Sequence, residues 1–230
     1  MGTDQRCAGL PLLWGIPVRP SYYIYDGAGD FGDRCVDVCE ASGLARVTAP
    51  EDATFAVAPK LTKFLPRHRW SAPLFGTLIF HPSILPYHRG PDAIRWTVLK
   101  GERVSGVTWF WCDDGVDAGP ICEQEPVLLC PSESPGRAYH TRFVPAGVRA
   151  LERAVEGVLM GHPRRVNQDL ALGTYESFHY SNQHEKGCLR QKVLKPPPMP
   201  PTPSKPAPVR KITAIHGYSR LLTPDCVAHR

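Results

Sequence analysis

Short runs of apolar, β-branched and aromatic residues are spread along the first half of the chain. Runs of this kind are typical of strands that are covered on both faces of a sheet. Four of them are predicted to be strands: YYIY (22–25), TFAVA (54–58), GTLIF (76–80) and VTWFWC (107–112).

Helical patterns lie between and after these runs. GPDAIRWTVLKG, residues 90–101, predicts a helix with Pro91 in its first turn and Gly101 at its end. A longer helix is predicted to begin near Pro145, because apolar residues recur at steps of three and four up to Val158. The alternation of strand and helix predicts βαβ units, and therefore an α/β fold with a mainly parallel sheet.

Composition separates a folded part from a tail. Of the 230 residues, 42% are hydrophobic and 21% are charged, which is typical of a globular domain. Eight prolines lie within residues 195–208, and a segment so rich in proline supplies no helix or strand hydrogen bonds. We therefore expect a folded domain over residues 20–180 and a disordered, Pro-rich basic tail over residues 181–230.

The charge of this tail leaves its role open. Residues 185–230 hold nine Lys or Arg against two Asp or Glu. A basic tail of this kind binds RNA, an anionic membrane or an acidic partner, or is simply solvated. We favour the solvated tail and expect no nucleic-acid partner.

The cysteines and the amino end bear on the cellular setting. The eight cysteines include no C-x-x-C pair, and no nearby His or Cys completes a ligand set with Cys35 and Cys39, so no metal site is predicted. Scattered free thiols are typical of the reducing cytosol. The opening stretch AGLPLLWGIPV is too short and too broken by proline to span a membrane. The prediction is a cytoplasmic protein without a membrane partner.

A G-x-G-x-x-G pattern lies at Gly27, Gly29 and Gly32, after one predicted strand and before the helical pattern RCVDVCEASG. This is the context of a dinucleotide site, and Glu51 follows at about the expected distance. Three aspartates crowd the same loop, however, and their charge opposes a pyrophosphate. We favour a Gly-rich turn that lets a helix pack closely on a strand.

Two polar stretches follow predicted strands. FHPSILPYHRG, residues 80–90, sets His81 directly after one strand, and DDGVDAGP, residues 113–120, follows the next. Because ligands bind at the carboxyl ends of parallel strands, and neighbouring strand ends lie about 5 Å apart, His81 and Asp117 are predicted to meet. A carboxylate beside a histidine fixes its tautomer and favours its protonated form, which suits proton transfer and oxyanion stabilisation. Taken alone, three aspartates near two glycines are most often a solvated turn.

These stretches, with the helix between them, resemble the folate-dependent formyltransferase family. The similarity runs from about Phe55 to Glu176, includes KFLP, RFVPAGV and GTYE, and within the family is greatest to the hydrolase domain of 10-formyltetrahydrofolate dehydrogenase. The resemblance implies a Rossmann-like fold. It also implies an enzyme that takes a formyl group from 10-formyltetrahydrofolate and transfers it to water or to a small amine.

The resemblance also assigns roles to residues. His81 is the expected catalytic histidine, and Asp117 is the expected essential aspartate that orients His81 and the attacking water. The residues expected to contact or border the folate are Lys63, Phe64, Leu65, Asp113, Asp114 and Asp117.

The chain departs from the family pattern in two places. Ile79 stands where most transferases carry an Asn, which favours the hydrolase-like subgroup and removes one amide donor. The family places about a hundred residues before the histidine, whereas this chain has 80, and its first 50 residues match poorly. A missing first strand is therefore expected to leave one sheet edge uncovered.

Three functions remain open from the sequence. The first is an enzyme that releases formate from 10-formyltetrahydrofolate or formylates an amine. The second is an N-formyltransferase for an amino sugar or an aminoacyl acceptor. The third, of another class, is a folate-binding remnant without turnover, which the disrupted amino end favours and the intact His81 and Asp117 oppose.

Overall fold

A computed structural model describes residues 12–13, 16–17, 19–25, 29–61, 63–130 and 133–176. The strands are β1 (Leu12–Leu13), β2 (Ile16–Pro17), β3 (Ser21–Ile24), β4 (Ala45–Arg46), β5 (Phe55–Ala58), β6 (Thr77–His81), β7 (Val104–Trp111) and β8 (Ile121–Leu128). The helices are α1 (Asp30–Ala41), α2 (Arg67–Trp70), α3 (Ala93–Leu99), α4 (Pro135–Ala138) and α5 (Val144–Leu159), with a 3₁₀ turn, η2 (Pro50–Asp52), and a π-helical turn, η3 (Tyr139–Phe143).

Six strands form one sheet in the order β4-β3-β5-β6-β7-β8. β4, β3, β5 and β6 pair in parallel, whereas β7 runs antiparallel to both of its neighbours. Five of the six strands therefore point in one direction, and the predicted mainly parallel α/β sheet is confirmed. β1 and β2 form a separate antiparallel pair.

The connection from β6 through α3 to β7 corrects one prediction. The prediction of a βαβ unit is wrong here, because β7 runs antiparallel to β6. Leu78 pairs with Trp111 and His81 pairs with Thr108. β7 thus ends beside the start of β6. The segments that follow these two strands therefore leave the sheet at opposite ends of β6. The seven-residue helix α3 begins at Ala93, two residues beyond Pro91.

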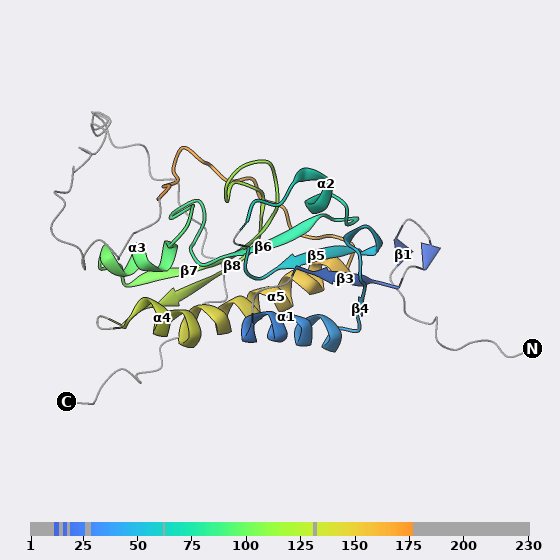
Figure 1. The fold of residues 1–230 in the computed structure, drawn as a ribbon, viewed down its shortest axis with the longest axis horizontal. Helices are drawn as coiled ribbons and strands as arrows, with labels where there is room; N and C mark the ends of the chain where they lie inside the picture. Colours follow the sequence, from blue (N-terminus) through green and yellow to red (C-terminus); the bar gives the residue numbers. More distant parts are fainter. Residues whose placement is uncertain are drawn as a thin grey trace, which may run out of the picture. The chain divides into compact units, whose positions relative to one another are not determined.

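α1 and α5 cover one face of the sheet (Figure 1). Phe31 of α1 packs edge-on against Phe80 of β6, with ring centroids 4.7 Å apart, and Phe80 packs on Trp109 of β7 at 5.4 Å. The indole N–H of Trp109 donates to the carbonyl of Gly147 at 2.8 Å. A Cβ at Gly147 would meet the Phe80 ring at 2.7 Å, so the glycine allows α5 to lie close to the sheet. The predicted long helix and its apolar face are confirmed.

The opposite face is covered by loops and by α2 (Figure 1). Its smaller core contains Ile79, Leu85 and Phe110, against which Leu65 and Cys112 pack. Successive side chains of a strand alternate between faces, so His81 shares this loop-covered face with Ile79.

The amino end completes the sheet on the side of β5. β3 pairs along β5 and β4 pairs along β3, so the edge of the sheet on this side is β4. β4 has two residues, and a short edge strand offers little backbone for pairing with another chain.

The Gly-rich stretch leads into α1. Gly29 caps the helix with φ +53°, Gly32 is buried in the first turn, and Asp30 pairs with Arg34 at 3.1 Å. This is the arrangement of a turn that brings a helix onto a sheet. Gly27 and the predicted tail over residues 181–230 lie outside the described residues.

Candidate active site

His81 is the last residue of β6 and is 6% exposed. Its ring Nε2 lies 2.7 Å from the backbone carbonyl of His88, so Nε2 carries a proton and donates it. Its other nitrogen, Nδ1, lies 3.6 Å from Oδ2 of Asp117, an ion-pair distance rather than a hydrogen bond. A neutral ring with its proton on Nε2 turns a lone pair toward the carboxylate, whereas a protonated ring turns an N–H toward it. The expected protonated form of His81 stays a prediction.

Asp117 reaches His81 by a route that the sequence did not predict. Its loop leaves the sheet at the start of β6, where the backbone N–H of Cys112 donates to the carbonyl of Thr77 at 2.8 Å. The loop then runs over the face opposite α1 and α5, toward the far end of the strand (Figure 1). His81 and Asp117 thus approach each other at an ion-pair distance, outside hydrogen-bond reach, and the loop brings them together rather than two neighbouring strand ends.

The conformation of Asp117 is fixed by three contacts. Its Oδ2 accepts a hydrogen bond from the backbone N–H of Gly90 at 2.7 Å. The side-chain amide of Gln168 donates to the carbonyls of Asp117 and Gly119, at 3.0 and 2.7 Å. Asp117 has φ +49°, in the left-handed region that non-glycine residues rarely occupy. Strained backbone of this kind persists where surrounding contacts hold it, which is common at functional sites.

The other predicted residues lie on the same side of the sheet but are more open. Lys63 and Phe64 are exposed, Phe64 to 72%, and Leu65 packs into the small core beside Ile79. They follow β5, which runs parallel to β6 and pairs Ala58 with Ile79. Their segment therefore leaves the sheet at the same end of the strands as His81.

Asp113 and Asp114 make only local or exposed contacts. Asp113 accepts from the N–H of Gly115 at 2.9 Å, which closes a turn. Asp114 pairs with the guanidinium of Arg67 at 3.2 Å, and this pair is solvent-exposed. The structure therefore brings His81 and Asp117 together, whereas Asp113 is held in a local turn and Asp114 is exposed.

Sequence reasoning missed the residues that hold this pair. His88 and Gly90 lie in the same FHPSILPYHRG stretch as His81, so their proximity to it was a usable signal. Gln168 and Glu176 come from the segment after α5, about 90 residues further along the chain. Nothing in their local pattern points to His81, because the contact depends on how that segment folds back.

The charge of the loop also acts on its cysteine. Burial, followed by the charges of Asp113, Asp114 and Asp117, raises the pKa of the Cys112 thiol to about 12. A thiol so rarely ionised is a poor nucleophile. Among the described residues, no group of three or more His, Cys, Asp or Glu side chains is placed to hold a metal ion.

Comparison with known proteins identifies the family. A family model described as formyl transferase matches residues 40–155, half of the chain. The chain belongs to the formyl transferase family. The prediction of a formyltransferase-family enzyme is thereby confirmed.

Curated relatives match the same region. The chain is 36% identical over 125 residues to cytosolic 10-formyltetrahydrofolate dehydrogenase of Xenopus laevis, covering 54% of this chain and 14% of the relative. It is 36% identical over 133 residues to the mitochondrial 10-formyltetrahydrofolate dehydrogenase of Homo sapiens, covering 58% and 14%. The matched region thus spans about one-seventh of the length of these relatives.

Solved structures share the fold. HypX from Aquifex aeolicus in complex with tetrahydrofolic acid matches with a TM-score of 0.60 at 20% identity, covering 69% of this chain and 29% of that one. Methionyl-tRNA formyltransferase from Clostridium thermocellum matches with a TM-score of 0.54 at 13% identity, covering 71% and 74%. The Rossmann-like formyltransferase fold is therefore confirmed. In the part of the chain that the structure describes, no helix is both long and apolar enough to cross a membrane.

Proposed function

We propose that the chain takes the formyl group from 10-formyltetrahydrofolate and transfers it to water, as a hydrolase-like enzyme of one-carbon metabolism. The observation that carries the proposal is the buried His81–Asp117 pair, with 3.6 Å between Nδ1 and Oδ2, in a chain of the formyl transferase family. The names of the 36% identical relatives and the tetrahydrofolic acid bound to HypX support the same donor.

The two side chains have complementary tasks in this reaction. Attack of water on the formyl carbon places negative charge on the formyl oxygen, and a protonated His81 stabilises that charge. Asp117 orients the ring and the attacking water. A positioned donor of this type is typically worth about 3–4 kcal/mol in the transition state.

The neighbouring loops offer suitable contacts for a flat, amide-bearing cosubstrate. Phe64 presents an exposed aromatic ring, Lys63 beside it is exposed, and Leu65 extends the apolar surface toward Ile79. The loop that holds Asp113, Asp114 and Asp117 adds polar groups, and Asp114 pairs with Arg67 of α2. These are the residues through which we propose that the folate binds, with no metal in the reaction.

The side chain at position 79 favours water over an amine as the acceptor of the formyl group. Ile79 is buried in the small apolar core on the face that carries His81, so it gives the formyl group no amide donor. A small amine is the alternative acceptor, and a folate-binding protein without turnover is the alternative of another class.

The experiment is to incubate the full chain with 10-formyltetrahydrofolate, with and without candidate amines, and to measure formate and formylated amine. We expect formate release without any amine. A formylated amine without formate would assign an amine transferase instead. Binding of 10-formyltetrahydrofolate without either product would assign the non-catalytic folate-binding function.

The compartment is proposed on the cysteines. The five described cysteines that are free, Cys35, Cys39, Cys112, Cys122 and Cys130, are consistent with a reducing compartment. The relatives carry both cytosolic and mitochondrial names, and we propose the cytoplasm.

A further inference from the structure

The ring of His81 is held by the backbone of a second histidine. Its Nε2 proton is donated to the carbonyl of His88 at 2.7 Å, and both residues are 6% exposed. This single acceptor decides which ring nitrogen of His81 carries the proton in the neutral state. It thereby also decides which nitrogen faces Asp117. The orientation of the His81 ring therefore depends on where the His88 carbonyl lies.

The backbone of His88 does not adopt its conformation readily. It has φ +54°, a left-handed value that costs a non-glycine residue about 1–2 kcal/mol. Its N–H donates to Oγ1 of Thr174 at 2.8 Å, from the segment after α5. The conformation is therefore held from outside the 80–90 stretch.

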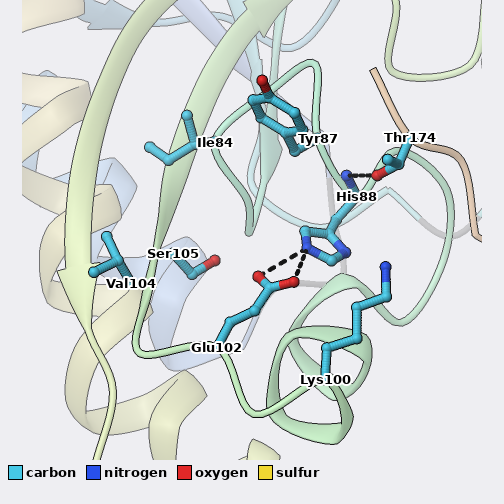
Figure 2. A pocket seen from close by; sticks show the side chains of 8 residues that line it. All are labelled: Ile84, Tyr87, His88, Lys100, Glu102, Val104, Ser105 and Thr174. Carbon is cyan, nitrogen blue, oxygen red and sulfur yellow. Dashed lines mark hydrogen bonds and ion pairs between the residues drawn. The ribbon is translucent and has the colours of Figure 1, made fainter. Parts of the chain in front are cut away.

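The side chain of His88 supplies two further contacts. Nδ1 lies 2.5 Å from Oε2 of Glu176. Nε2 lies 3.0 Å from Oε2 of Glu102 (Figure 2). A ring nitrogen at these distances from a carboxylate is satisfied only as an N–H donor. Both ring nitrogens of His88 are therefore engaged, each by a carboxylate that comes from a different segment.

Glu176 links this ring to a lysine. Lys100, which follows α3, pairs with the second oxygen of Glu176. The side chains of His88 and Glu176 are only 8% and 10% exposed. Removing one member of a buried pair leaves the other charge uncompensated, which makes such clusters firm anchors. A cavity of about 320 Å³ adjoins the cluster on the side of Glu102 and Lys100 (Figure 2).

We propose that His88 is a positioning residue for His81. Glu102 and Glu176 hold the ring of His88, and the held ring keeps the backbone carbonyl of His88 in place. This carbonyl in turn fixes the proton of neutral His81 on Nε2. The consequence for turnover rests on the proposed function, whereas the effect on the His81 proton does not.

The decisive variant is His88→Gly. Glycine adopts φ +54° freely, so this change removes the ring without adding backbone strain. With its carbonyl no longer anchored, the neutral His81 is expected to move its proton to Nδ1, where it donates to Asp117. We expect kcat for formyl release to fall about 10- to 100-fold with KM changed little, because misplacing a catalytic group costs this much.

A conservative variant, His88→Asn, tests rescue. The side-chain amide that it introduces occupies the place of the imidazole Nδ1 and donates to Glu176, while the contact with Glu102 is lost. The effect on the His81 proton and on kcat is expected to lie between those of the wild type and of His88→Gly. If His88→Gly does not fold, His88→Asn alone decides.

Glu133→Gln is the matched control. The side chain of Glu133 is 5% exposed and pairs with Arg142 at 3.1 Å, and none of the contacts described for it is to the histidine site. It resembles Glu176 in burial and charge, so it reports a general loosening of the fold. We expect it to leave the His81 proton on Nε2.

The measurement is a long-range ¹H–¹⁵N spectrum of the full chain labelled at histidine nitrogens, recorded at pH 8, with the His81 signals assigned by their loss in His81→Gln. A shift of His81 from the Nε2–H to the Nδ1–H form in His88→Gly, graded in His88→Asn and absent in Glu133→Gln, supports the proposal. An unchanged Nε2–H form in the folded His88 variants, or an equal change in Glu133→Gln, would overturn it. Because the spectrum needs no turnover, it decides this proposal even if the chain releases no formate.

Discussion

Nδ1 of His81 lies 3.6 Å from Oδ2 of Asp117, although their segments leave the sheet at opposite ends of β6. The pair exists because the loop after β7 folds back along the strand and is fastened by the N–H of Gly90 and the amide of Gln168. Its geometry therefore depends on segments that lie far apart in the sequence. Substitutions can test both these fastenings and the chemistry that they support.

Gly90→Ala should disturb the site through the backbone. Gly90 has φ +92°, and a Cβ there would collide with the carbonyl of Glu176 and the ring of Tyr175. Both the N–H that holds Asp117 and the segment that carries Glu176 would have to move. We expect the free energy of unfolding to fall by about 1–3 kcal/mol beyond the cost of the left-handed conformation alone, together with a loss of formyl release.

Gly101→Ala is the matched control for that cost. Gly101 has φ +69°, and a Cβ there meets nothing within 4 Å. Urea unfolding of both variants measures the difference between them. Equal losses of stability would mean that the segment around Glu176 is not packed as described.

Cys112 should react slowly with alkylating reagents in the folded protein. Burial and the neighbouring aspartates raise the pKa of its thiol to about 12, so almost none is thiolate at pH 8. Its reactive fraction grows only as the pH rises toward that pKa. Iodoacetamide labelling at pH 8, read by peptide mass spectrometry, is expected to modify Cys112 much faster in urea-unfolded chain than in folded chain. Equal rates would contradict the burial and the negative potential of the loop.

His81→Ala should abolish formyl release and leave binding of 10-formyltetrahydrofolate nearly intact. The side chain acts on charge that develops during the reaction, and not on the bound cosubstrate. Loss of a positioned donor of this type costs about 10²–10³ in rate. Formate release and a fluorescence titration of the ligand check the two parts. Turnover at the wild-type rate would remove His81 from the mechanism.

The chain from Pro196 onward should be dispensable for stability and activity. The prediction rests on the proline-rich sequence over residues 195–208 and on the lack of an apolar period beyond it. A chain that ends at Lys195 is expected to keep the melting temperature and the rate of formyl release of the full chain. Loss of either would show that the tail contributes to the folded domain.

The sequence predicted the elements of the fold better than their directions. Apolar runs and helical periods located β3, β5, β6, β7 and the long helix α5. Nothing in the run VTWFWC indicates whether the strand runs parallel or antiparallel to its neighbour. The short helix α3 was compatible with a crossover, and only the pairing of His81 with Thr108 settles the direction.

The candidate site was predictable where a residue type carries the chemistry. His81 and Asp117 were identifiable because an imidazole and a carboxylate follow predicted strands, in the stretches FHPSILPYHRG and DDGVDAGP that resemble the formyltransferase family. His88 and Glu176 were not identified, because their roles depend on a long-range contact and a backbone carbonyl. Only the family resemblance singled out Asp117 from Asp113 and Asp114. The structure adds a physical distinction, because Asp113 closes a turn and Asp114 forms an exposed pair with Arg67.

That distinction allows the most direct test of the proposed pair, the kinetics of Asp117→Asn, Asp113→Asn and Asp114→Asn. Asparagine at position 117 tolerates the left-handed conformation and still accepts from Gly90, but it removes the charge beside His81. We predict that formyl release by Asp117→Asn falls by about 10²–10⁴ with little change in affinity for 10-formyltetrahydrofolate. The other two variants should lose far less activity. Small and equal losses in all three variants would leave His81 without its partner and contradict the proposed pair.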